Sequence, residues 1–506
     1  MRNIKKLLSG KIFWVIALVS VQIVIIGFLL TWLVESFPVA NYILIGLSGI
    51  LTFWLLNKYE NPSYKIIWLL IIVILPVFGF IFYAALGNKA AKRSVFKWMS
   101  KRTYKGSYTG LVRDDSVYGR LSDLSTDALR QAEYIYSTSG MPLYEDTETV
   151  YIKNGEEFYS MMKEQMSLAE HYIYLEFFQI ARGEMWDGVF AVLKDRMAAG
   201  VEVRILCDDA GSNMQKSFLD EIKESGIQVR LFNPMVPVLS VKHNNRDHRK
   251  ICVIDGNTAF TGGINISDEY INAVSPLGYW LDMGIMIKGR GVESFHEMFL
   301  ATWNFLSGIK DNITVPRACA AEGAPGYVVP YETNPFINGD AGINIFLNMI
   351  TRAKRYVYIA SPYLILDFAA EQALMTAAKS GLKIKILMPG TPDKELPYLM
   401  ATKHFPNLIN AGVEIYRYNK GFMHGKLFLA DDDFGIVSTI NLDFRSLYLH
   451  FEDGIWMYKT SCLGDLKKDF EDNFSKSDLV TMDYVKEIAW YKRLFRTIIT
   501  PFAPLM

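Results

Sequence analysis

One short pattern occurs twice in this chain, and it limits the folds that the chain can adopt. Each copy combines a histidine, a lysine and an aspartate, and an asparagine follows each copy at the same distance. The two sets are His248-x-Lys250-x4-Asp255 with Asn265, and His424-x-Lys426-x4-Asp431 with Asn441. The duplication predicts one active site built from two halves, each of which supplies an imidazole, an ammonium group and an amide.

The segments around the two motifs predict a duplicated α/β fold. Strands rich in β-branched and aromatic residues alternate with segments of helical spacing from about residue 140 onward. The first half predicts strands at 169–178, 200–207, 226–232 and 282–287, with helices at 186–199 and 218–225; the second half predicts matching strands at 353–360, 381–387, 412–418 and 452–457. Matched strands in the same order indicate an internal repeat, so we expect two similar α/β domains that form one active site.

Three apolar runs precede this region and predict transmembrane helices. They cover residues 12–34, 39–56 and 66–86, and a helix needs roughly 20 apolar residues to cross a bilayer. A set of buried helices in a soluble protein is the alternative. Pro76 and Gly79 make the third run a candidate for a break. Basic residues at both ends of this region leave the number and orientation of the spans open.

These features divide the chain into six expected parts. They are membrane segments (1–87), a basic juxtamembrane linker (88–139), a first domain (140–318), a connector rich in glycine and proline (319–338), a second domain (339–483) and a C-terminal amphipathic helix (484–506). The basic linker acts as a topogenic signal or attracts anionic lipid. The C-terminal helix lies either in a membrane interface or against the enzyme body.

The spacing within each motif assigns positions on a strand. Apolar residues follow each lysine, so each His and Lys lie at the beginning of a strand and share one face, because alternate strand residues point the same way. Asp255 and Asp431 complete the two candidate catalytic motifs, but they fall on the opposite face at the end of the strand. We therefore expect these carboxylates to be structural and to hold the following turn.

Two imidazoles and two ammonium groups suit chemistry on a phosphodiester. One neutral histidine attacks phosphorus, and the other, protonated, gives its proton to the leaving alcohol. The lysines, with Asn265 and Asn441, bind the non-bridging oxygens. Asp282 and Glu452, at the start of matched strands, are each expected to orient one histidine. This chemistry requires no metal and no other cofactor. The remaining histidines are expected to be structural: His171, His243, His296, His404 and His450.

The paired motifs resemble those of the phospholipase D superfamily and, within it, those of bacterial cardiolipin synthases. The resemblance is carried by residues 61–68, 75–80, 261–268 and 438–446 and by Phe451-Glu452. The chain departs from the family pattern at Ser438, where glycine is common, and at His450, where asparagine is frequent. The apolar run at 12–34 is additional to the two spans of the family.

The resemblance implies an activity and a location. It implies that phosphatidylglycerol is the substrate, that His248 is the nucleophile and that His424 is the acid and base. A phosphatidyl group would pass to a second phosphatidylglycerol, which gives cardiolipin and glycerol without a metal. It also implies a multi-pass protein of the cell membrane with a cytoplasmic catalytic domain.

Two other classes of function remain open at this level. A hydrolase would use the same motif with water as the acceptor, and a lipid-binding scaffold would use no chemistry at all. Both His–Lys pairs are intact, which argues against the scaffold. A net charge of zero and the apolar runs argue against nucleic acid as a partner, because nucleic-acid binding favours a basic surface.

Overall fold

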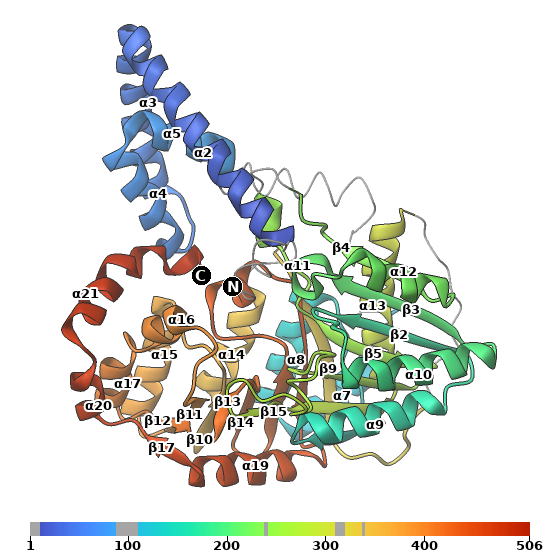
Figure 1. Cartoon of the computed structure of the whole chain (residues 1–506). Coiled ribbons are helices and arrows are strands. Elements are labelled where there is room, and N and C mark those ends of the chain that lie inside the picture. The colour runs from blue at the N-terminus through green and yellow to red at the C-terminus, as the bar shows by residue number, and fades with distance from the viewer. Residues whose placement is uncertain (1–10, 88–109, 237–240, 309–318, 336–339, 506) are drawn as a thin grey trace.

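The computed structural model describes residues 11–87, 110–236, 241–308, 319–335 and 340–505. Two α/β domains lie side by side, and helices from the N-terminus project away from them (Figure 1). The chain is an α/β protein with two similar sheet-containing domains, as the sequence predicts.

The first domain contains a seven-stranded mixed sheet in the order β1-β8-β6-β5-β2-β3-β4. Its strands are β1 (Thr147–Ile152), β2 (Tyr172–Phe177), β3 (Glu202–Asp208), β4 (Gln228–Phe232), β5 (Lys250–Ile254), β6 (Thr258–Gly262) and β8 (Gly284–Gly289). Helices α9 (Gly155–Ser167), α10 (Glu184–Ala198) and α12 (Lys216–Glu224) bury apolar side chains against it, and α13 (Val292–Ser307) packs against the domain too.

The second domain contains an eight-stranded sheet in the order β17-β12-β11-β10-β14-β15-β16-β9. Read from β9, this order repeats that of the first domain, and β17 is added at the far edge. Its strands are β9 (Tyr327–Thr333), β10 (Tyr356–Ala360), β11 (Lys383–Pro389), β12 (Glu414–Tyr418), β14 (Leu427–Ala430), β15 (Phe434–Ser438), β16 (Glu452–Tyr458) and β17 (Ser477–Leu479). The main helices are α14 (Ala341–Arg352), α15 (Phe368–Lys379), α17 (Phe405–Ala411) and α19 (Leu463–Ser475). The predicted strands around the motifs are thus present in both domains.

One hydrophobic core joins the two domains. It includes Trp303 of α13, Tyr331 of β9 and Trp456 of β16, all of which are buried. A second core lies under α9 and α10 and contains Phe158 and Trp186. Because the larger core is continuous, the sheets are held in a fixed relation, which the active site between them needs.

The expected connector at 319–338 is partly a strand of the second domain. Strand β9 pairs antiparallel with β16 over its whole length, from Tyr327–Tyr458 to Thr333–Glu452. Its residues are all buried. The glycine and proline content of this segment obscured a strand that is specified by its partner across the sheet and not by local sequence.

The expected linker at 88–139 also contains folded elements. Residues 88–109 lie outside the described residues, but α7 (Asp115–Leu124) and α8 (Thr126–Ser139) are helices. The buried Gln131 of α8 accepts a hydrogen bond of 3.0 Å from Nε1 of Trp456. This helix pair therefore belongs to the enzyme body and packs against the second domain.

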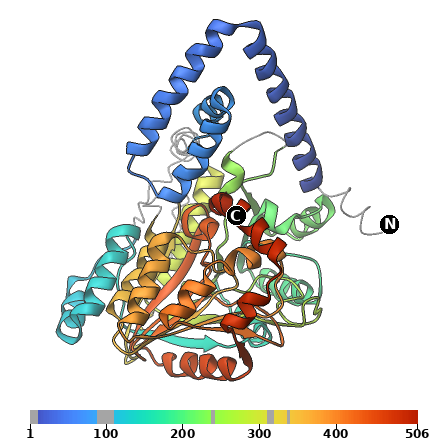
Figure 2. The same cartoon turned by 90° about the vertical axis from the view of Figure 1, so that its left-hand side faces the viewer.

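The N-terminal helices are α2 (Lys11–Ser36), α3 (Pro38–Asn57), α4 (Pro62–Ile74) and α5 (Pro76–Leu86) (Figures 1 and 2). Among the described residues, α3 is the helix whose length and apolar composition suffice to cross a bilayer. The apolar run at 66–86 is broken at the suspected position, because α4 ends at Ile74 and α5 begins at Pro76. A Cβ on Gly79 would lie 2.6 Å from Cα of Ile72, so this glycine lets α5 pack closely on α4.

The expected C-terminal helix is three short elements, α20 (Met482–Glu487), α21 (Trp490–Ile499) and the 3-10 turn η2 (Thr500–Leu505). Arg496 of α21 donates a hydrogen bond of 2.8 Å to Thr402 of the body. Ala503 of η2 packs with Tyr64 of α4 and Phe444, so the C-terminus meets the base of the N-terminal helices (Figure 1). The opposite side of α21 exposes Trp490, Tyr491, Leu494, Phe495 and Ile498.

Candidate active site

Each motif histidine is positioned by backbone hydrogen bonds to the other domain. Asp247 pairs with Phe451 in an isolated parallel bridge, and the His248 N–H donates to the carbonyl of Phe451 at 2.8 Å. In the other half, β7 (Tyr279–Leu281) pairs in parallel with β13 (Gly421–Met423). The His424 N–H donates to the carbonyl of Leu281 at 2.7 Å.

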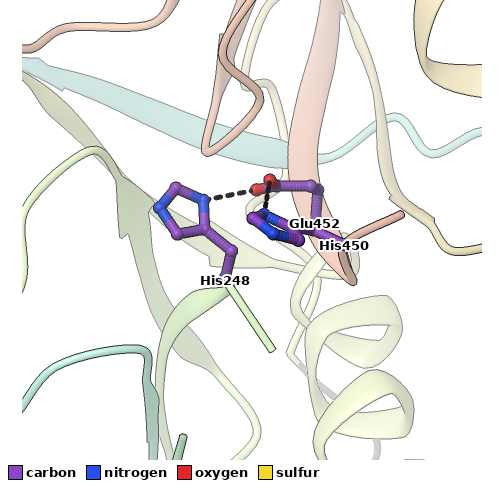
Figure 3. A group of neighbouring side chains, drawn as sticks. All are labelled: His248, His450 and Glu452. Carbon is purple, nitrogen blue, oxygen red and sulfur yellow. Dashed lines mark hydrogen bonds and ion pairs between the residues drawn. The ribbon is translucent and has the colours of Figure 1, made fainter. Parts of the chain in front are cut away.

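These pairings place each histidine beside a carboxylate from the opposite domain. Glu452 directly follows Phe451, and its Oε2 lies 2.8 Å from Nδ1 of His248 (Figure 3). Asp282 directly follows Leu281, and its Oδ2 lies 2.6 Å from Nδ1 of His424. The two carboxylates named from the sequence thus contact the histidines, and each contact crosses the domain boundary.

The location of the histidines differs slightly from the expectation. Strand β5 begins at Lys250 and β14 begins at Leu427, so both histidines precede their strands. The physical reason is that their backbone pairs with the other domain, which the sequence of one domain does not reveal. Each lysine nevertheless lies close to its histidine, since Lys250 Nζ donates to the His248 carbonyl at 2.7 Å and Lys426 Nζ donates to the His424 carbonyl.

Burial keeps both imidazoles neutral in the free site. Desolvation lowers the pKa of His248 to about 3 and the pKa of His424 to about 4. Burial alone would raise the pKa of Glu452, but contact with His248 and His450 outweighs it and holds this pKa below its ordinary value. Burial opposes ionisation of Asp282 as well, yet Lys426 and His424 hold its pKa low. Each ionised carboxylate therefore accepts the Nδ1–H, which leaves a lone pair on Nε2.

The two lysines bring positive charge to the same site. Desolvation lowers the pKa of Lys250 to about 8 and the pKa of Lys426 to about 7. The charge of Lys250 also lowers the pKa of His424 and of Lys426. The halves therefore share one electrostatic environment, with cations able to hold an anionic group between two imidazoles.

Asp255 and Asp431 bind backbone N–H groups at a distance from the two histidines. Asp255 accepts backbone N–H groups from residues 170–172 at 2.7–2.8 Å. Asp431 accepts those of residues 354–356 at 2.6–3.0 Å. Both residues have positive φ angles, 50° and 58°. These carboxylates therefore bond to the start of the neighbouring strand, β2 or β10, whereas the sequence predicted that they hold the turn that follows them.

The two asparagines have unlike surroundings. Asn265 accepts the backbone N–H of Gln179 at 3.1 Å and donates to the hydroxyl of Tyr270 at 2.6 Å. Asn441 is buried too, and its Oδ1 has no hydrogen bond within the described part of the chain. The amide of Asn265 thus orders the protein around the site. Contact of either amide with a phosphoryl oxygen stays a prediction.

A buried arginine next to His248 is absent from the sequence-based predictions. Arg249 is fully buried and forms ion pairs with Glu176 at 2.7 Å, Asp247 at 2.9 Å and Glu332 at 3.0 Å. Glu332 lies on β9 of the second domain, so Arg249 joins the domains beside His248. The equivalent position of the other motif is Gly425. The sequence signal that could have indicated this residue is an arginine between His248 and Lys250, directly before an apolar strand.

Asp453 is a second connection between the domains that the sequence did not suggest. Its Oδ1 accepts the Lys250 N–H at 3.2 Å, and its Oδ2 accepts the hydroxyl of Thr261 on β6. Burial raises the pKa of Asp453 to about 7. Because Asp453 follows Glu452, one strand end both orients His248 and fixes the lysine of the same motif.

His450, expected to be purely structural, lies inside the site. Its Nδ1 is 3.5 Å from Oε1 of Glu452, and its ring centroid is 5.7 Å from that of His248 (Figure 3). Aromatic residues that belong to neither motif lie beside the two histidines. The ring of Phe178 lies 5.0 Å from His248, and the rings of Tyr270 and Trp280 lie 5.7 and 5.5 Å from His424.

Comparisons with known proteins match both domains and part of the N-terminal helices. A family model described as cardiolipin synthase, PLD-like domain, matches residues 162–303 and 346–476, and one described as Phospholipase_D-nuclease N-terminal matches residues 46–88. An uncharacterized protein of Streptococcus mutans is 37% identical over 90% of this chain and 99% of its own length. A cardiolipin synthase of Alkalihalophilus pseudofirmus is 30% identical over 95% of this chain and 96% of its own.

A solved structure shares the fold. The crystal structure of phosphatidylserine synthase from Haemophilus influenzae aligns with a TM-score of 0.56 at 14% identity, and it covers 75% of this chain and 98% of that one. At this identity the likeness concerns the arrangement of the two domains and not the substrate.

Proposed function

Because the chain belongs to the cardiolipin synthase family of phospholipase D-type enzymes, we propose that it joins two phosphatidylglycerol molecules into cardiolipin and releases glycerol. The observation that carries this proposal is the crossed pair of contacts, His248 with Glu452 and His424 with Asp282. Two oriented imidazoles with free Nε2 atoms and two buried lysines form a site for transfer of a phosphoryl group through a covalent intermediate.

In the first step, Nε2 of His248 attacks the phosphorus of one phosphatidylglycerol. The P–N bond forms as the bond from phosphorus to the glycerol oxygen breaks. The negative charge of the bound phosphodiester favours the imidazolium form of His424, which gives its proton to the departing glycerol. Glu452 stabilises the positive charge that develops on the His248 ring.

In the second step, the hydroxyl of another phosphatidylglycerol attacks the phosphatidyl-histidine. His424, now neutral, accepts the hydroxyl proton, and the P–N bond breaks to restore His248. Lys250 and Lys426 stabilise the non-bridging oxygens in both steps, where charge builds up in a site that excludes water. The apolar N-terminal helix α3 and a substrate that is itself a membrane lipid support a reaction at a membrane surface.

The product assay tests the choice of acceptor. The full-length protein is purified in detergent and mixed with vesicles of phosphatidylglycerol alone. We expect a four-chain lipid and glycerol in equal amounts. Phosphatidic acid and glycerol without the four-chain lipid would identify a hydrolase, and the absence of any product would favour a lipid-binding scaffold.

A phosphatidyl ester of p-nitrophenol separates the roles of the two histidines. This leaving group departs without a proton, so His424→Asn should release one p-nitrophenol per enzyme and then stop, because the acceptor lacks a base. His248→Asn should release none. A burst in His248→Asn together with none in His424→Asn would reverse the assignment of the nucleophile.

A further inference from the structure

A third imidazole lies beside the proposed nucleophile and has unused hydrogen-bonding capacity. Nε2 of His450 has no hydrogen bond within the described residues, and Nδ1 of His450 meets Oε1 of Glu452 at 3.5 Å without the geometry of a hydrogen bond, although all these atoms are buried. Buried polar atoms ordinarily have partners. The space between His248, His450 and Glu452 (Figure 3) is therefore a place where a further group can satisfy these atoms.

The donor atoms of this cluster have the spacing of a cation site. One donor atom from each residue lies within 4.8 Å of the other two. Two ligands of a tetrahedral zinc ion stand about 3.3 Å apart, since each bond is about 2.0–2.1 Å long. The separations of 2.8 Å from His248 Nδ1 to Oε2 of Glu452 and of 3.5 Å from His450 Nδ1 to Oε1 of the same carboxylate lie on either side of this value.

We propose that His248, His450 and Glu452 bind a divalent cation of the zinc type, and that this binding inhibits the enzyme. Two imidazoles and one carboxylate form a donor set that zinc favours, with a fourth position left for water. The cation takes no part in the proposed reaction. It competes with the reaction for the ring of His248, and the inhibitory half of the inference rests on the proposed role of that ring as nucleophile.

The inhibition follows from the position of one proton. Without a cation, Nδ1 of His248 carries the proton and donates it to Glu452, while Nε2 keeps its lone pair. Coordination through Nδ1 uses the lone pair of that atom, so the single ring proton must reside on Nε2. The ring stays neutral and no proton is lost, but Nε2 no longer has a lone pair to attack phosphorus.

Direct binding tests the site without any assay of activity. Zinc is titrated into the full-length protein in detergent against a chromogenic chelator, with wild type, His450→Asn and His404→Asn compared. His404 forms a similar pair with Glu371 at 2.9 Å and serves as the matched control outside the site. We expect zinc affinity to fall about tenfold or more in His450→Asn and to be unchanged in His404→Asn. Equal affinity in all three proteins would refute the site.

The p-nitrophenol burst tests the inhibition. For each protein, the burst with zinc is divided by the burst without zinc, so a change in basal rate cancels. Zinc should suppress the burst of wild type, a chelator should restore it, and His450→Asn should need at least about ten times more zinc. A burst unaffected at saturating zinc would overturn the inhibition. Zinc binding that depends on His450 in a protein without transferase activity would refute the proposed function and leave this site standing.

Discussion

His248 and His424 occupy equivalent positions in the two domains, yet a second histidine and a buried ion-pair network lie beside the first, whereas three aromatic rings lie beside the second. His248 shares its carboxylate with His450, and Arg249 beside it binds Glu176, Asp247 and Glu332. In contrast, His424 is enclosed by rings that lie 5.5–5.7 Å away, those of Tyr270, Trp280 and Phe422.

The difference shows which features a duplicated site keeps and which it changes. Both halves keep the backbone pairing that sets His248 against Glu452 and His424 against Asp282. This pairing depends on the main chain, so it tolerates changes of the side chains around it. The surroundings can then diverge, and one imidazole can serve as nucleophile while the other serves as acid and base.

The largest expected effect is on the reaction rate, and it should differ between variants of the two orienting carboxylates. Glu452→Gln should slow the p-nitrophenol burst by about 10³–10⁴-fold, because the amide no longer fixes the reactive tautomer of His248. Asp282→Asn should lower turnover of phosphatidylglycerol by a similar factor but spare the burst, which needs no acid. Burst and turnover are measured for both variants. Equal suppression of the burst in both would show that the two halves do not divide the work.

The next largest effect concerns stability and the residue between His and Lys in each motif, which is Arg249 in the first and Gly425 in the second. Arg249→Met leaves Glu176, Asp247 and Glu332 without their common cation, and loss of one partner of a buried ion pair costs about 3–5 kcal/mol. Gly425→Ala should cost little, because its new Cβ meets the flexible side chain of Met283. Thermal denaturation of the detergent-solubilised proteins measures both. Similar losses of stability in the two variants would mean that the charged network around His248 does not contribute more to stability than the equivalent position of the other motif.

The lysines predict how activity depends on pH. An amine is charged below its pKa, so a rise in pH removes the charge of Lys426, with a pKa of about 7, before that of Lys250, with a pKa of about 8. The kcat/KM, which reports the free enzyme, should therefore fall as pH rises through about 7. Lys426→Arg keeps its charge and should move this fall upward by about one pH unit. An unchanged profile in Lys426→Arg would exclude Lys426 as the titrating group.

The smallest effect on the reaction is expected for the aspartate of each motif, whose surroundings are alike in the two domains. Asp255→Asn and Asp431→Asn each weaken the hold on three backbone N–H groups and should reduce stability by about 1–3 kcal/mol. Asparagine tolerates the positive φ at both sites. The burst per folded enzyme should not change. A selective loss of the burst in either variant would show that this carboxylate reaches the chemistry.

The motif residues and their supporting strands were predictable because their signals are local and occur twice. The apolar runs after Lys250 and Lys426 correctly predicted strands β5 and β14, and the repeat of matched strands correctly indicated the two-domain α/β fold. In contrast, β9 lies in a segment with the composition of a connector, and its pairing with β16 depends on a strand more than a hundred positions away. Pro76, already suspected as a break, ends a predicted span because it cannot continue the hydrogen bonding of a helix.

By itself, the sequence determined the chemical groups, their duplication and the two carboxylates next to the matched strands. Only the tertiary structure decided that Glu452 holds His248 and that Asp282 holds His424, each from the opposite domain. The same holds for His450, which strand periodicity could not place beside His248. The physical reason is that periodicity fixes which way a side chain points from its own strand, whereas its partner depends on how two separate sheets pack.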